Sequence, residues 1–518
     1  MDSTDLKEYK MHKFKEGNHA RANPFFSKRG MIIFGILLIL LAIFVTSQDI
    51  MCDDFYWHIS VGEWIVENQE IPTTGIFSWT GADTPWFAHE WLAEIVMYWF
   101  SLLGASFGGW LYFTICITIM FTMIYFMNKN EINKNYMVGM GAWVLLVVAT
   151  KMVGSARPHM LSISFFIFLL YALEQLRKNE NSKLIYFTPI VTLIWANYHG
   201  GTVMFIPILF LIYICSSLFN FNFMKLQGKR LSKKQIITML VLFGINMLVV
   251  CINPHGFELI TYPFSYSNIA TKYIGEWQAP SWKSNPFAII LIIINCVILF
   301  LTRKKLQFTD LGVIGTLMMM TLVYIRFVWW LAVVMMFFIF KYVPAYNAQT
   351  LKKFKIGVLL VLFVGIICIL LPHYEFGISE STFKPEAIQV IKNTEYNNLF
   401  NVYDAGNILI YNDIDVFLDG RSDMYQHVQS PHIYQDKESE NYDPERTISV
   451  LEEGMNFENY AIPNMGEFID KYELDLFMVT KRSKCRFYLE TRDDVELLYK
   501  DEYTYIYKIN NEGAVANG

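Results

Sequence analysis

Acidic and aromatic side chains crowd one stretch near the start of the chain, from Asp49 to Glu94. It contains nine Asp and Glu residues and five tryptophans, but no Lys or Arg. Asp53 and Asp54 are adjacent, and His58 follows Asp54 at the spacing of one helical turn. A positioned carboxylate can accept a proton from a reacting hydroxyl. Because the stretch follows a long apolar run, it predicts a site at a membrane surface for a polar substrate on an apolar tail.

Further ionisable residues flank apolar runs later in the chain. Ionisable groups near membrane depth are costly, and they favour a functional interpretation. Arg157 and Arg326 are each nearly alone in segments otherwise poor in positive charge, and the guanidinium fork suits phosphate. The alternative is that each merely snorkels at a helix end. The remaining candidates of this kind are His89, Glu90, His159, His199, His255 and Glu276.

Each candidate also has a structural interpretation. Asp53 and Asp54 could cap a helix, because carboxylates suit a helix N-terminus. Asp54 and His58 could form a simple ion pair on one helix face. His199 and His255 stand beside glycines and could bond the last carbonyls of a helix. Glu94, one turn after Glu90, is expected to be solvated.

The run Asp419-Gly420-Arg421-Ser422-Asp423 allows two interpretations. Gly420 permits a turn with positive φ, which an Asp419–Arg421 ion pair would fix. Alternatively, Arg421 and Asp423 point at the membrane site and bind the acceptor or a glycan.

Composition predicts an α-helical polytopic membrane protein. The chain has 518 residues, of which 54% are hydrophobic and only 17% are charged, against about a quarter in soluble domains. Seven scattered cysteines form neither a disulfide framework nor a metal motif. About eleven spans are expected, at 31–45, 107–127, 136–150, 160–175, 185–197, 202–219, 236–252, 287–302, 308–325, 327–343 and 356–371. Several of these ranges are short, and the segments at 136–150 and 185–197 could be tilted or partly re-entrant.

Successive connections between the expected spans are alternately rich and poor in Lys and Arg. With the N-terminus inside, the inner segments carry 24 of them and the outer loops before residue 372 carry five. The positive-inside rule therefore predicts a cell-membrane protein with a basic cytoplasmic tail (1–30) and a transmembrane domain (31–371) with a large first outer loop (48–106). Residues 372–518 are then an extracytoplasmic α/β domain, with helices expected at 385–392 and 468–472 and strands at 408–411, 416–418, 474–479 and 503–509.

These features resemble the GT-C superfamily of membrane glycosyltransferases, over nearly the whole chain in architecture. The motifs that carry the resemblance are Asp-Asp-Phe-Tyr-Trp-His-Ile-Ser-Val-Gly-Glu-Trp-Ile from Asp53, His-Glu-Trp-Leu-Ala-Glu from His89, and Val-Phe-Leu-Asp-Gly-Arg-Ser-Asp-Met-Tyr from Val416. They resemble a group of uncharacterised bacterial and archaeal proteins of that type. The resemblance implies transfer of a sugar from a polyprenyl-phosphate-linked donor to a cell-envelope acceptor on the outer face of the membrane.

The resemblance also implies roles for residues. Asp53 or Asp54, with Asp53 favoured, would be the base of an inverting transfer. Arg157 and Arg326 would hold the donor phosphate, helped by His199 and His255. The cofactor is unknown. A divalent cation is possible, because the acidic and histidine side chains supply oxygen and nitrogen ligands, but their spacing matches no compact metal motif. The rival functions are a transporter or flippase for a lipid-linked glycan and a non-catalytic envelope-assembly scaffold. No nucleic-acid patch is apparent.

Overall fold

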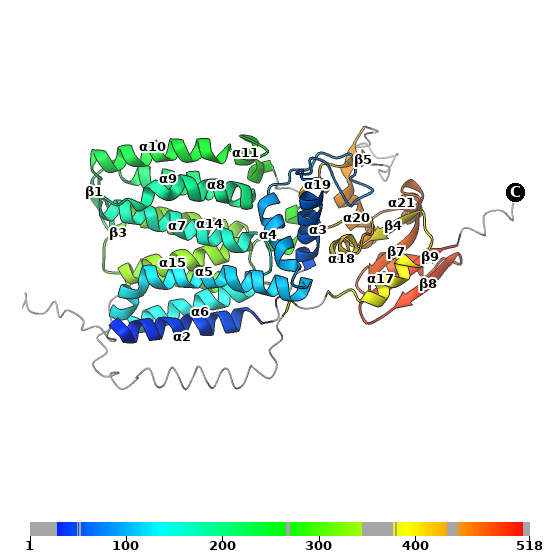
Figure 1. The fold of residues 1–518 in the computed structure, drawn as a ribbon, viewed down its shortest axis with the longest axis horizontal. Helices are drawn as coiled ribbons and strands as arrows, with labels where there is room; N and C mark the ends of the chain where they lie inside the picture. Colours follow the sequence, from blue (N-terminus) through cyan, green and yellow to red (C-terminus); the bar gives the residue numbers. More distant parts are fainter. Residues whose placement is uncertain are drawn as a thin grey trace, which may run out of the picture.

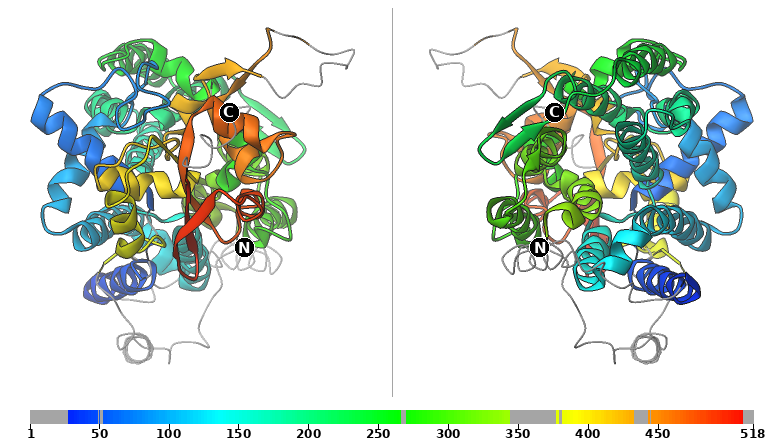
Figure 2. Two further views of the ribbon diagram at one scale, coloured as in Figure 1. Left: turned by 90° about the vertical axis from the view of Figure 1, so that its right-hand side faces the viewer. Right: turned by 90° about the vertical axis from the view of Figure 1, so that its left-hand side faces the viewer.

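The computed structural model describes residues 28–48, 50, 53–265, 270–343, 377–378, 381–432, 443 and 445–510. Three parts follow one another along its longest axis: a helix bundle, a small helical layer and a mixed α/β region (Figure 1). Viewed along that axis from the α/β side, the strands near the C-terminus lie in front of the bundle (Figure 2). The chain thus places its α/β region over one end of the bundle.

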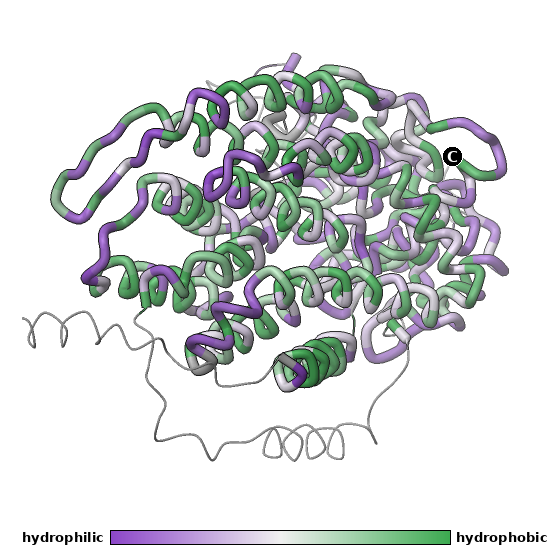
Figure 3. Tube along the Cα trace, turned by 60° about the vertical axis from the view of Figure 1, so that its left-hand side comes forward, coloured by the Kyte–Doolittle hydropathy of each residue, from purple (hydrophilic) through white to green (hydrophobic). Residues whose placement is uncertain are grey.

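Apolar helices form the bundle, and their hydrophobic residues run along most of their length (Figure 3). Five described segments are long and apolar enough to cross a membrane: Arg29–Thr46, Ala105–Lys134, His159–Lys178, Lys233–Val250 and Ile325–Tyr342. Five shorter apolar segments are Val138–Val153, Leu184–Tyr198, Gly200–Ser216, Pro286–Leu301 and Phe308–Val323. Ten of the eleven ranges expected from the sequence therefore coincide with apolar helical segments. The eleventh, 356–371, lies outside the described residues.

The helices of the bundle have these bounds: α2 Lys28–Thr46, α5 Ala105–Lys134, α6 Tyr136–Val153, α7 His159–Lys178, α8 Thr188–Tyr198, α9 Phe205–Ser216, α10 Lys233–Val250, α13 Pro286–Leu301, α14 Phe308–Val323 and α15 Val328–Tyr342. The segment Ile325–Tyr342, which contains α15, is the most enclosed of the five long candidates, with 78% of its residues buried. Its neighbours therefore surround it, and the bundle has a protein-filled centre.

Two helices from the connection between α2 and α5 form the middle layer: α3 (Asp53–Asn68) and α4 (Trp91–Ser101). They pack closely because Gly62 of α3 has no side chain. A Cβ there would lie 2.1 Å from the backbone oxygen of Glu94 in α4. This approach buries His58, which has 2% of its surface exposed, and Glu94, with 1% exposed. The expectation that Glu94 is solvated is therefore wrong.

The α/β region contains a four-stranded sheet in the order β4-β7-β9-β8. Strands β4 (Asn398–Asn401) and β7 (Leu474–Thr480) are parallel, and β9 (Thr504–Ile509) is antiparallel to β7 and β8 (Val495–Lys500). Every residue of β7 is buried, as expected for a strand covered on both faces. The strands expected at 474–479 and 503–509 are confirmed.

Helices surround that sheet, including α17 (Pro385–Lys392), where a helix was expected, and α21 (Met465–Lys471). The strand expected at 408–411 is wrong, because these residues belong to helix α18 (Gly406–Tyr411). The strand expected at 416–418 is reduced to a single bridge between Val416 and Ser78. The other elements here are α19 Ser422–Tyr425, α20 Val450–Glu458, α22 Cys485–Leu489, β5 Gln429–Pro431 and β6 Thr447–Ser449.

The far end of the bundle carries a small three-stranded sheet, formed by β1 (Phe221–Phe223), β2 (Leu226–Gly228) and β3 (Leu306–Gln307). It joins two connections that are distant in the sequence. At the other end, short helices α11 (Glu258–Ser265) and α12 (Ala270–Tyr273) lie in the connection between α10 and α13. These two ends carry the two cavities described below.

Candidate functional site

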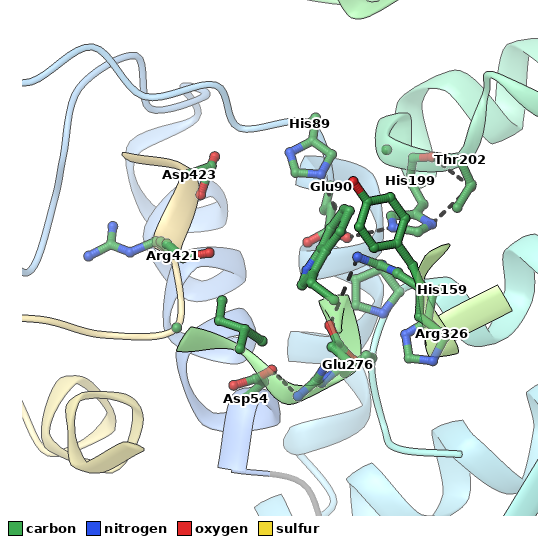
Figure 4. A pocket seen from close by; sticks show the side chains of 18 of the residues that line it. Asp54, His89, Glu90, His159, His199, Thr202, Glu276, Arg326, Arg421 and Asp423 are labelled. Atoms are coloured by element: carbon green, nitrogen blue, oxygen red, sulfur yellow. Dashed lines mark hydrogen bonds and ion pairs between the residues drawn. The ribbon is translucent and has the colours of Figure 1, made fainter. Parts of the chain in front are cut away.

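A cavity of about 920 Å³ lies between the bundle and the middle layer. Its wall comes from α3, α4, the ends of several bundle helices, and two loops of the α/β region. The structure brings eleven of the thirteen residues expected from the sequence to this wall: Asp54, His58, His89, Glu90, Arg157, His159, His199, Glu276, Arg326, Arg421 and Asp423. Asp53 and His255 are not among its lining residues. Figure 4 shows most of these side chains converging from both sides.

Asp54 and Arg157 form the shortest ion pair of the cavity. Arg157 Nη2 lies 2.5 Å from Asp54 Oδ2, and the side-chain amide of Asn407 donates to Asp54 Oδ1 at 2.9 Å. Burial raises the pKa of Asp54, whereas the charge of Arg157 opposes this rise. The structure therefore holds Asp54 in one orientation, between the membrane bundle and the α/β region.

Glu276 joins the two arginines that were expected to bind phosphate. Its carboxylate lies 3.3 Å from Arg157 Nη1 and 3.9 Å from Arg326 Nη1. Burial raises the pKa of Glu276, but the two guanidinium groups outweigh it and hold the pKa at about 2. Arg326 also stacks over the ring of Trp277, 4.2 Å from its centroid. The two arginines are each nearly alone in the sequence, but the fold places both of them beside the carboxylate of Glu276.

A cluster of histidines and glutamates forms another part of the wall. Glu90 Oε1 lies 3.1 Å from His199 Nε2 and 3.9 Å from His89 Nε2. His199 Nδ1 lies 2.8 Å from the hydroxyl of Ser162 and 3.0 Å from that of Thr202. Burial would raise the pKa of Glu90, but the adjacent imidazoles outweigh it and keep the pKa below its usual value. Glu90 is thus an ionised carboxylate held by histidines.

His58 turns toward Glu94, and the ion pair with Asp54 that the spacing allowed does not form. Its Nδ1 lies 3.4 Å from Glu94 Oε1 and 3.9 Å from Glu90 Oε2. Burial lowers the pKa of His58 to about 3, and burial raises the pKa of Glu94 well above its usual value. His58 is therefore neutral near pH 7, and burial favours the uncharged form of Glu94.

Two overlapping groups of side chains could hold a metal ion. His89, Glu90 and His199 bring one ligand atom each within 4.8 Å of one another, and so do His58, Glu90 and Glu94. The first group offers two imidazoles and one carboxylate, which suits a divalent transition metal. Neither group could be found from spacing, because His199 in the first group and His58 in the second are distant in the sequence from Glu90. A divalent cation stays open for this cavity.

Asp53 lies beside Asp54 but faces other acids. Burial, Asp54 and Asp404 raise its pKa to about 6, against the opposing effect of Arg157. Adjacent residues of a helix point about 100° apart, which explains why only Asp54 reaches the cavity. The two carboxylates are thus not equivalent.

Both interpretations of the 419–423 run hold in part. Arg421 donates to Asp419 from Nε at 2.8 Å and from Nη2 at 2.6 Å, as a local pair would. Its guanidinium points away from Glu90 and His199 (Figure 4), although Arg421 lines the cavity. Asp423 also lines it and accepts a hydrogen bond from the hydroxyl of Tyr262 at 2.8 Å.

Gly420 serves close packing, and the positive φ expected there is wrong. Among the described residues, the glycines with positive φ are Gly104 and Gly256. A Cβ on Gly420 would lie 2.7 Å from Trp57 Nε1, 2.9 Å from Asn407 Oδ1 and 3.0 Å from Asp54 Oδ1. The absence of a side chain therefore lets the α/β region approach the acidic end of α3.

His255 stands behind the cavity wall. Its ring stacks on Phe87 with centroids 3.6 Å apart, and Phe87 stacks in turn on Tyr262 at 4.4 Å. The structure therefore gives His255 a packing contact and places it away from the arginines. Other lining residues went unnoticed in the sequence, including Tyr262, Tyr403 and Asp404. Only the proximity of Tyr403 and Asp404 to the 419–423 motif could have suggested them.

Comparisons with known proteins find likeness at the level of structure. No protein-family model matches the chain, and no curated protein matches it. Among solved structures, the chain is similar to ArnT from Cupriavidus metallidurans bound to undecaprenyl phosphate. That likeness covers 93% of this chain and 98% of the other, with a TM-score of 0.47 and 8% sequence identity.

Proposed function

We propose that the protein is a membrane glycosyltransferase that moves a sugar from a polyprenyl-phosphate donor to a cell-envelope acceptor on the outer face of the membrane. The observation that carries the proposal is one cavity that combines a held carboxylate, Asp54, with two arginines, Arg157 and Arg326. A sugar transfer of this kind needs a base for the acceptor hydroxyl and positive charge for the departing phosphate.

One part of the cavity wall is apolar. It contains Met319, Met320 and Val323 at the end of α14, Phe327 just before α15 and Trp330 in the first turn of α15. A polyprenyl chain is apolar and its phosphate is charged, so such a donor would match a wall of this composition beside the arginines. A soluble sugar nucleotide would not need the apolar wall.

The ion pairs suggest an order of events. Before donor binding, Asp54 and Glu276 neutralise Arg157, and Glu276 also faces Arg326. A donor phosphate that engages both guanidinium groups would weaken their hold on these carboxylates. Asp54 would then take the proton of the acceptor hydroxyl while that oxygen bonds to the anomeric carbon. The bond from that carbon to the phosphate oxygen breaks, and the lipid phosphate leaves with the electron pair.

The α/β region contributes to the same cavity through Tyr403, Asp404 and residues 420–423. In the proposal, this region closes the outer side of the cavity and binds the acceptor. Asn407 and Gly420 fix its position, because both contact the acidic end of α3. A region that served only as a scaffold would not need to complete the wall of a cavity with a held carboxylate.

Comparison of glycans tests the proposal without knowledge of the sugar. Lipid-linked and surface glycans are measured by mass spectrometry in a deletion strain, in the strain complemented with the wild-type gene, and in one complemented with Asp54→Asn. The proposal expects one surface glycan to lack a sugar in the deletion and Asp54→Asn strains, and its polyprenyl-phosphate donor to accumulate. Identical glycans in all strains would contradict it, and a transporter would instead leave a completed glycan on the inner side.

A further inference from the structure

A second cavity, of about 740 Å³, lies at the other end of the bundle. Helix α7 joins the two cavities: His159 at its start lines the first, and Arg177 and Lys178 at its end line the second. Nineteen steps of an α-helix span roughly 30 Å, about the thickness of a hydrocarbon core. The two cavities therefore lie on opposite sides of the proposed membrane, and the second faces the cytoplasm in the predicted topology.

Six basic side chains line this second cavity, and its lining contains no Asp or Glu. They come from four separate connections or helix ends of the bundle. These residues are Arg177, Lys178, Lys229, Lys304, Lys305 and Lys341. Convergence from distant parts of the chain differs from a charged run on one helix, which would merely be solvated. The fold itself concentrates positive charge here.

Buried carboxylates position two of the six cations. Asp310 is fully buried; its carboxylate lies 2.9 Å from Lys341 Nζ and 3.4 Å from Arg177 Nη2. Glu174 lies 3.0 Å from Arg177 Nη2 and 3.3 Å from Lys341 Nζ. Tyr342 also donates to Asp310, at 2.8 Å. These ion pairs hold Arg177 and Lys341 in place, and the two carboxylates balance the two positive charges.

The other four cations form no ion pair within 4.0 Å with a carboxylate that the structure describes. Lys305 donates only to the side-chain oxygen of Asn222, at 2.6 Å, and to the backbone oxygen of Met224, at 2.8 Å. Lys178, Lys229 and Lys304 make no ion pair within 4.0 Å with a described acidic residue. Four like charges around one hollow raise the local positive potential and attract an anion.

We propose that this cavity binds a phosphate group on the cytoplasmic side, independently of the reaction in the first cavity. Lysines act as point charges toward phosphate, and the arginine can add a fork of donors. Two sources share this chemistry. One is the headgroup of an anionic phospholipid, because basic pockets between helices on that side suit such headgroups. The other is a soluble phosphate compound.

The experiment uses the full chain in nanodiscs and compares wild type with the Lys229→Gln/Lys304→Gln double variant. The matched control is Lys183→Gln/Lys233→Gln, which removes two exposed charges at the same end of the bundle but outside the cavity. Retained phosphatidylglycerol is measured by native mass spectrometry from mixed phosphatidylglycerol and phosphatidylcholine discs. Binding of pyrophosphate is measured by calorimetry in discs of phosphatidylcholine alone.

The proposal expects at least one probe to bind wild type and the control variant with the same affinity. That probe should bind the cavity variant roughly thirtyfold more weakly, which is the loss expected for two basic groups. Loss of phosphatidylglycerol retention identifies the lipid source, and loss of pyrophosphate binding identifies the soluble source. Equal binding of both probes by all three proteins, or no binding by wild type, would overturn the proposal. Melting midpoints show whether the variants are folded. Sugar transfer plays no part in these readouts.

Discussion

Arg157 Nη2 lies 2.5 Å from Asp54 Oδ2, and this contact joins the helix bundle to the middle layer. Arg157 stands in the connection between α6 and α7, whereas Asp54 is the second residue of α3. The pair is partly open to the cavity, with 32% and 21% of the two side chains exposed. A phosphate arriving in the cavity can therefore compete with Asp54 for the guanidinium.

The two arginines should be needed for use of the donor. We predict that Arg157→Ala and Arg326→Ala each reduce kcat/KM for a synthetic polyprenyl-phosphate sugar by about a hundredfold, the effect of removing one electrostatic contact to a developing anion. Replacement by Lys should restore only part of the rate, because the forked geometry is lost. Lys283→Ala, which removes an exposed charge from an outer connection, is the matched control. Normal rates in both Ala variants would show that the phosphate assignment is wrong.

Gly420 should tolerate no side chain. Its Cβ would fall 2.7 Å from Trp57 Nε1 and 3.0 Å from Asp54 Oδ1, and overpacking of this kind costs about 1–3 kcal/mol. We predict that Gly420→Ala lowers the melting midpoint of the purified protein and reduces transfer. Gly244→Ala is the control, because nothing lies within 4 Å of a Cβ at that position. Equal midpoints for the two variants would contradict the close approach.

Asp53 should make stability depend on pH. Its pKa is raised from the ordinary 3.8 to about 6, so the folded state penalises the ionised form. The stability is therefore full below about pH 4 and falls as pH rises through 6. Asp53→Asn stays neutral and should stabilise the protein at pH 7.5 by about 1–2 kcal/mol, after allowance for partial exposure. Near pH 4 it should change little.

The melting midpoints of wild type and Asp53→Asn, measured in detergent at pH 4 and pH 7.5, check this prediction. Asp83→Asn, which replaces an exposed acid in the connection between α3 and α4, is the matched control. A gain from Asp53→Asn that is as large at pH 4 as at pH 7.5 would refute the role of ionisation.

The topology has its own test. The Lys and Arg distribution predicts an inside N-terminus and an outside C-terminal region. Reporter fusions after Lys355 and after Pro372 should report opposite sides of the membrane. The same side for both fusions would rule out the eleven-span arrangement, whatever the reaction is.

Sequence reasoning found most of the site because polar residues stand out among apolar helices. Arg157, Glu276 and Arg326 were visible for this reason, and the fold brings them to one cavity. The partner of His58 could not be found in this way. Glu94 reaches it only because Gly62 lets α3 and α4 pack closely, and such tertiary contacts leave no periodic signal.

The errors in the α/β region have a different cause. The apolar run from Ile408 to Tyr411 is rich in residues that favour strands, yet it forms part of α18. Short apolar runs do not distinguish a buried strand from a buried helix. A turn with positive φ was one of two interpretations of the sequence around Gly420, because turns of this composition are common. Its contact with Trp57 depends on a helix more than 350 residues away.

Transfer by Asp54→Asn and Asp53→Asn, measured side by side, tests the central claim most directly. Asn retains the shape of Asp but cannot accept a proton at neutral pH. The account predicts that Asp54→Asn loses at least about a hundredfold in turnover of a polyprenyl-phosphate sugar, while Asp53→Asn stays within a few fold of wild type, with both proteins folded by their melting midpoints. Normal turnover by Asp54→Asn would contradict the proposed base, and normal turnover by both variants would contradict the glycosyltransferase mechanism.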